Sequence, residues 1–157
     1  MKKTILLVAS YLAVFLIGFG AGIYFLPILT APPGPATSDV RAAAEDSMHS
    51  GQFRRDLQDS DAFHWGEGTV FVGQQTISLE GSVSPGPDYK LYLSPEYVET
   101  EAAFIRLKPN MAYIGDIKTF ENFIIHVPAS VDPLTFNTVV VWCETFSQFI
   151  TAAEYRW

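Results

Sequence analysis

The residue with the most distinctive chemistry in this chain is Cys143, the only cysteine among 157 residues. It follows Trp142 in the run FNTVVVWCETF. A lone thiol cannot form an intramolecular disulfide or run a dithiol cycle, which excludes exchange chemistry of the thioredoxin kind. Three readings of Cys143 stay open: a ligand to a metal or haem iron, a sulfenate or mixed disulfide, and a buried side chain without redox chemistry.

The three histidines are the next candidates for chemistry. His49, His64 and His126 stand at no recognised metal-ligand spacing from one another or from Cys143, so no metal site is predicted. His64 lies beside Trp65 just before a predicted strand, where a loop imidazole can line a pocket, and an ordinary surface histidine is the alternative. His126 lies at the end of another predicted strand, where a structural role is the default and ligation the alternative.

Several functional classes lack support in the sequence. No nucleophile elbow, phosphate loop, paired-histidine helix or calcium loop is present, so no enzyme activity is assigned. Asp56, Asp59 and Asp61 offer hard oxygen ligands to a cation, but a solvated loop is the commoner meaning of such a cluster. With 17 acidic and 10 basic residues, the chain is also a poor partner for nucleic-acid phosphate.

The elements that must position these residues are short strands. Runs rich in Val, Ile, Thr and aromatic residues predict strands over 68–72, 76–80, 90–93, 113–117, 123–127, 138–143 and 149–155. A tight hairpin is expected at 72–75, a break at 85–88, and an excursion with a helical turn over 94–108. We therefore predict an all-β fold, an antiparallel β-sandwich or barrel-like domain, over residues 49–157.

Strand alternation gives the expected orientation of Cys143. It places Val139, Val141 and Cys143 on one face, and Val140, Trp142 and Glu144 on the other. Because Glu144 favours solvent on its own face, Cys143 is expected to point inward.

The N-terminal segment predicts one transmembrane helix. Residues 4–30 contain no charged side chain and are long enough to cross a hydrocarbon core of about 30 Å, so residues 1–30 are interpreted as a signal anchor, with a cleaved signal peptide as the alternative. Lys2 and Lys3 precede the helix and place the N-terminus in the cytoplasm, which leaves the C-terminal domain periplasmic or extracellular. Residues 31–48 are a Pro-rich linker expected to lift the domain off the membrane, with a short helix over 39–48 capped by Ser38 or Asp39.

Five segments then point to a family. They are GQF from Gly51, FHWGEGTVFV from Phe63, GPDYKLYLS from Gly86, NFIIHVP ending at Pro128, and FNTVVVWCETFSQFITAAEY from Phe136. In this order they resemble the DM-thirteen domain, a family linked to electron transfer, and the chain resembles a membrane-anchored single-domain member. The resemblance implies that Cys143 carries redox chemistry, as a bare thiol or as a ligand to a group such as haem, in an extracytoplasmic setting.

The sequence therefore yields two main hypotheses, beside a third in which the chain is a structural envelope protein whose anchor and acidic domain space other components. The first is an extracytoplasmic electron-transfer accessory domain centred on Cys143, with Trp142, His64 and His126 as further cofactor-binding candidates, haem as the candidate cofactor and a membrane redox protein as the candidate partner. The second is a non-enzymatic β-sandwich that binds a ligand or a protein through loops 56–66 and 94–108, in which Cys143 is a buried structural residue.

Overall fold

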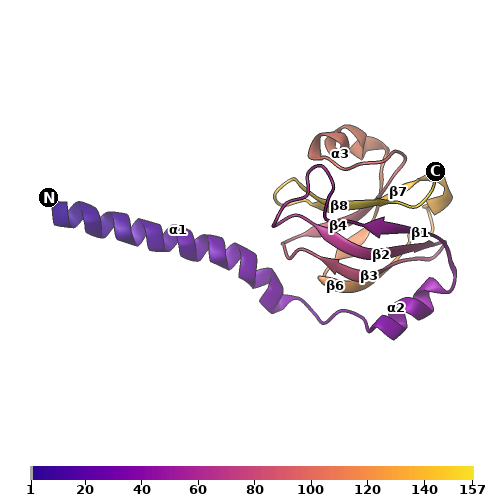
Figure 1. Cartoon of the computed structure of the whole chain (residues 1–157), viewed down its shortest axis with the longest axis horizontal. Helices are drawn as coiled ribbons and strands as arrows, with labels where there is room; N and C mark the ends of the chain where they lie inside the picture. Colours follow the sequence, from indigo (N-terminus) through magenta and orange to yellow (C-terminus); the bar gives the residue numbers. More distant parts are fainter. Residues whose placement is uncertain (1) are drawn as a thin grey trace.

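The computed structural model describes residues 2–157 and shows a long N-terminal helix beside a domain of two β-sheets (Figure 1). Three helices and two 3-10 turns accompany the strands: α1 (Lys2–Thr30), α2 (Thr37–Ala44), α3 (Glu101–Leu107), η1 (Lys108–Asn110) and η2 (Pro133–Thr135). The eight strands are β1 (Ser47–Phe53), β2 (Gly66–Gly73), β3 (Thr76–Val83), β4 (Tyr89–Ser94), β5 (Ala112–Ile117), β6 (Glu121–His126), β7 (Thr138–Cys143) and β8 (Gln148–Glu154).

The strands form an antiparallel β-sandwich, as the sequence predicts. One sheet has the order β1-β2-β3-β6 and the other β5-β4-β7-β8. All pairings are antiparallel, and β2 and β3 form the hairpin expected at 72–75. The break at 85–88 carries the chain from β3 in the first sheet to β4 in the second, so it joins the two layers.

The main core lies between the two sheets. Buried aliphatic side chains of β2 and β3 pack there against those of β4 and β7. Val139, Val141 and Cys143 all belong to this core, so the expected inward orientation of Cys143 is confirmed. Burial of this apolar area, rather than any disulfide, stabilises the domain.

The outer face of the second sheet forms another core, where the sequence suggested solvent. Trp142 stacks on Phe104 of α3, with ring centroids 3.9 Å apart. Glu144 accepts hydrogen bonds from Lys108 Nζ at 2.7 Å and from the Tyr92 hydroxyl. The expectation of an open face is wrong because α3, within the predicted 94–108 excursion, covers it and supplies a cation to Glu144.

All seven predicted strands are present, and β1 is an additional one. Its sequence SMHSGQF lacks the β-branched residues that mark the other strands, so only pairing with β2 reveals it. Gly51 allows this strand to pass close to β8, because a Cβ atom there would lie 2.7 Å from the Glu154 carbonyl oxygen. The two sheets therefore meet closely at this edge.

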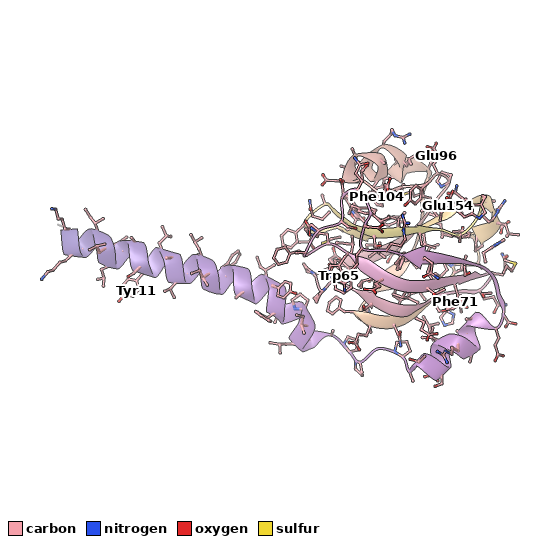
Figure 2. All side chains as sticks on the ribbon, viewed as in Figure 1. Tyr11, Trp65, Phe71, Glu96, Phe104 and Glu154 are labelled. Atoms are coloured by element: carbon pink, nitrogen blue, oxygen red, sulfur yellow. The ribbon has the colours of Figure 1, made fainter. Side chains whose placement is uncertain are left out.

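Helix α1 is set apart from the sandwich. It spans 29 residues, none of them buried, and is long and apolar enough to cross a membrane, as either a retained anchor or a signal sequence would be. Figure 2 shows Tyr11 and its neighbours projecting around the helix. Only the C-terminal part of α1 approaches the domain, where the rings of Tyr24 and Phe63 meet edge to face at 6.1 Å.

The linker is fastened to the domain. Asn122 at the start of β6 donates a side-chain hydrogen bond to the Pro35 carbonyl at 3.1 Å. Gly34 lies so close to β6 that an added Cβ would be 1.9 Å from the Glu121 carbonyl oxygen. The linker therefore runs along the sandwich and holds it beside the end of α1.

The short helix predicted in the linker is present as α2, although neither proposed cap is used. The N-cap is Ala36, which makes no side-chain capping bond. The helix is instead fixed by packing, since Val40 is fully buried and Arg41 pairs with Glu80 of β3 at 2.7 Å. Tertiary contacts thus replace the local cap.

Candidate functional site

A cavity of about 140 Å³ lies at the end of the sandwich that faces α1. Four segments enclose it: the C-terminal part of α1, the loop before β2, the turn 85–88 and the turn between β7 and β8. Its wall is mostly apolar, with rings from Tyr24, Phe63, Tyr89 and Phe146. Cys143 and His64 also line it, so the structure brings two of the four predicted site residues together.

Cys143 occupies the last position of β7, directly opposite Tyr89 of β4 in the register. Its side chain is only 2% exposed. The thiol donates a hydrogen bond to the Pro87 carbonyl oxygen at 3.0 Å. Burial raises the pKa of this thiol, and the backbone amides of Phe146 and Thr145 oppose that shift only in part. The resting state of Cys143 is therefore a protonated, hydrogen-bonded thiol.

The two turns that flank the thiol are tied to each other through Asp88. The Glu144 amide donates to the Asp88 carbonyl, and the Thr145 hydroxyl donates to the Asp88 carboxylate, both at 3.2 Å. Asp88 has φ 57°, a left-handed conformation that aspartate tolerates better than most residues. These bonds fix the position of the turn 85–88 over Cys143.

Tyr89 forms the buried side of the cavity. Its hydroxyl lies 3.5 Å from the Ser84 hydroxyl. Desolvation by burial raises the pKa of Tyr89 to about 12, so its hydroxyl is neutral at physiological pH. The wall of the cavity next to Cys143 thus carries no charge from this ring.

His64 is held by Asp61. Its Nδ1 atom lies 2.9 Å from Asp61 Oδ2, and Asp61 Oδ1 accepts hydrogen bonds from the backbone amides of Phe63 and His64. Desolvation acts against ionisation of Asp61, but these hydrogen bonds outweigh it and lower the pKa of Asp61. Because a carboxylate only accepts, Nδ1 carries the proton, which leaves Nε2 of the neutral ring as an acceptor.

The other two predicted site residues lie elsewhere. Trp142 points to the opposite face of the sheet from Cys143 and packs beneath α3. His126 is an exposed residue at the end of β6, opposite Thr76, and does not line the cavity. The structure therefore separates both residues from the thiol.

The acidic segment 56–61 is used for local structure. Asp59 accepts a hydrogen bond from the Glu101 amide at the start of α3 at 2.7 Å, and Asp61 binds its own loop. Within residues 2–157, no group of three or more His, Cys, Asp or Glu side chains is placed to hold a metal ion.

Haem does not fit this site. The cavity volume of about 140 Å³ is below the range of roughly 300–1,000 Å³ typical of pockets for drug-sized ligands, and haem is larger than most of those. The sulfur is also occupied by Pro87 and covered by the turn 85–88. A thiolate ligand to haem iron would require both turns to move and the thiol to lose its proton.

The fold and site define a small antiparallel β-sandwich with one buried cysteine on the wall of a terminal cavity. The electron transfer DM13 family matches residues 53–155. The chain therefore belongs to that family, and the resemblance seen in the sequence is confirmed. No curated protein and no solved structure matches the chain.

Two contributors to the site, Tyr89 and Pro87, were missed in the sequence, and a third, Asp61, was considered only as a cation ligand. Tyr89 faces Cys143 only through the pairing of β4 with β7, which no local pattern reveals. The contact of Pro87 with the thiol depends on the same pairing. Asp61 does carry a local signal, since the spacing Asp-x-x-His permits a loop in which the carboxylate binds the histidine three residues on.

Proposed function

We propose that this protein is an electron-transfer accessory domain held outside the cytoplasm by α1, with Cys143 and the cavity beside it as its redox site. The observation that carries the proposal is that Cys143, the only thiol of the chain, lines the same cavity as His64, whose backbone amide is held by Asp61. Membership of the electron transfer DM13 family supports the same chemistry.

The position of the site also supports this role. Electron transfer is favoured when the atoms around the redox group stay in place. A rigid site has this property, because little protein or solvent must reorganise when the charge changes. The bonds through Asp88 and Pro87 hold the cavity wall in place, and burial keeps water away from the thiol. The site is thus suited to a small redox-active group held against Cys143.

The anchor gives the proposed location. Lys2 and Lys3 flank the start of α1, and the next basic residue is Arg41, so the positive-inside rule leaves the sandwich on the outer side. A membrane redox protein is then the natural partner, because both are confined to the same bilayer.

The test is a difference spectrum of the full chain purified from its native membranes, reduced with dithionite and then oxidised with ferricyanide. We expect a reversible spectral change from a bound group, lost in Cys143→Ala and retained in His126→Gln, whose side chain lies outside the cavity. A flat difference spectrum for the native chain would overturn the proposal.

The second candidate is the binding module without redox chemistry. It is favoured by the protonated, 2% exposed state of Cys143, since a buried cysteine is commonly an inert small hydrophobe. In that case Cys143→Ser would leave ligand or partner binding intact, because the hydroxyl can still donate to Pro87.

A further inference from the structure

The cavity lies at the level where α1 would leave the bilayer. About 20 helical residues cross the hydrocarbon core, so a span that begins at Thr4 ends near Ile23. Ile23 and Tyr24 are the helix residues that line the cavity, together with Gly20. One side of the cavity is therefore formed by the part of α1 that leaves the bilayer.

Exposed aromatic side chains surround the same opening. Phe63 is 61% exposed and Phe146 48% exposed, although both line the cavity. Tyr24 contacts Phe63 edge to face. Aromatic rings are favoured at the boundary between lipid and water, so this end of the sandwich is suited to rest on the bilayer surface. A molecule dissolved in the membrane could then reach the cavity without passing through water.

The size of the cavity selects a single ring. A dry protein cavity of about 150 Å³ accommodates benzene, and this cavity measures about 140 Å³. The rings of Tyr89 and Phe146 offer a planar guest the offset or edge-to-face contacts that aromatic pairs prefer. A long lipid tail would have to stay outside, between the anchor and the exposed phenylalanines.

One polar group of the cavity, His64, favours a guest that donates a hydrogen bond. His64 lines the wall, and its Nδ1–H is committed to Asp61. In this tautomer the remaining nitrogen, Nε2, can accept a hydrogen bond from a ring hydroxyl. A quinone in its oxidised form carries only carbonyl acceptors and lacks this bond.

We propose that the cavity binds the ring of a hydroquinone dissolved in the membrane, with a ring hydroxyl on His64 and the ring beside Cys143. This inference rests on the proposed function and names the ligand class of the same site. It concerns binding of the reduced ring, which needs no further reactant.

The test is equilibrium binding of unsubstituted 1,4-benzohydroquinone to the full chain in nanodiscs, measured calorimetrically without oxygen and corrected for uptake by empty nanodiscs. We expect saturable binding with one site per chain. His64→Gln should weaken the affinity at least tenfold, whereas the matched variant His126→Gln should leave it unchanged. The oxidised benzoquinone should bind more weakly than the hydroquinone.

Two results would overturn the inference. One is the absence of saturable binding beyond the uptake of empty nanodiscs, and the other is an affinity that His64→Gln and His126→Gln change equally. Neither result affects the difference spectrum of the native chain, so a bound redox group with no affinity for hydroquinone would leave the proposed function standing and remove only this ligand class.

Discussion

Cys143 and Pro87 are joined by a hydrogen bond of 3.0 Å from the thiol to the carbonyl oxygen, although 56 residues separate them along the chain. The bond connects the end of β7 to the turn that carries the chain between the two sheets. It satisfies a carbonyl that lacks a strand partner, and it holds the sulfur in its protonated form. Reactivity at Cys143 is therefore coupled to the position of the turn 85–88.

The first prediction concerns the titration of this thiol. Alkylation of the native chain by iodoacetamide should be slow at neutral pH and should rise at higher pH than in the urea-unfolded chain. The physical reason is that burial raises the pKa of Cys143 in the folded state. The folded state gains stability from the neutral thiol below the ordinary cysteine pKa, and this gain is lost as pH rises through the raised value.

Rates measured between pH 7 and pH 10 on the full chain in detergent micelles provide the check. Since Cys143 is the only cysteine, no background mutations are needed. A native midpoint at or below that of the unfolded chain would contradict the raised pKa.

The second prediction concerns Trp142 as a structural residue. Trp142→Ala should lower the free energy of unfolding by about 3–5 kcal/mol, the usual cost of truncating a large buried aromatic side chain. The loss includes the stack on Phe104, which fastens α3 to the sheet. Trp142→Phe, the matched control, keeps an aromatic ring and should cost clearly less.

Denaturant unfolding of the three proteins, followed by near-ultraviolet circular dichroism, measures these differences. If Trp142→Ala were as stable as Trp142→Phe, the stack on Phe104 would not contribute to the stability of the domain.

The third prediction concerns the fastening of the linker. Gly34→Ala should release the linker from β6 without unfolding the sandwich, because the new methyl group would collide with the Glu121 carbonyl oxygen, a backbone atom that cannot rotate away. Limited proteolysis should then cut between α1 and α2 faster than in the native chain.

Pro33→Ala is the matched control, since it changes a neighbouring linker residue without adding atoms. Equal cleavage rates for Gly34→Ala and the native chain would mean that the contact at Gly34 does not hold the linker.

The fourth prediction concerns the pH dependence of the loop that carries His64. The amide chemical shifts of Phe63 and His64 should report protonation of Asp61 with a midpoint below the ordinary aspartate pKa of about 3.9. The folded state lowers the pKa of Asp61, so the contribution of its hydrogen bonds is complete above the ordinary value and is lost as pH falls through the lowered one.

An NMR titration of the full chain between pH 6 and pH 2 provides the measurement, with Asp61→Asn as the control whose amide shifts should not follow this transition. A midpoint above the ordinary aspartate value would show that the hydrogen bonds do not favour the carboxylate.

Local patterns in the sequence predict most of the strands, but they do not predict which other elements pack against those strands. The runs around β7 and β8 are rich in β-branched and aromatic residues, so both strands and the inward orientation of Cys143 could be predicted. Glu144 misled the same reasoning, because a charged residue indicates solvent unless its partner is known. That partner, Lys108, follows α3, and its proximity depends on tertiary packing.

The site was harder to predict than the fold for the same reason. Cys143 and His64 were recognised as candidates from residue type, whereas the grouping of Cys143 with Tyr89 depends on strand pairing. Trp142 became a candidate because it precedes Cys143 in the sequence. Strand alternation, however, already places the two side chains on opposite faces of the sheet. Residues adjacent in a strand are separated by the sheet itself, and His126 lies on an edge strand of the opposite sheet.

The fastening of the linker at Gly34 and Asn122 has a consequence for the search for a partner. A freely jointed tether would let the sandwich sweep a hemisphere above its anchor and present the cavity in every direction. In the anchored protein that we propose, the docked linker limits this rotational freedom. The cavity therefore keeps nearly the same distance from the membrane and the same orientation. Encounters would then depend on lateral diffusion in two dimensions, and a partner would need its own site at matching depth.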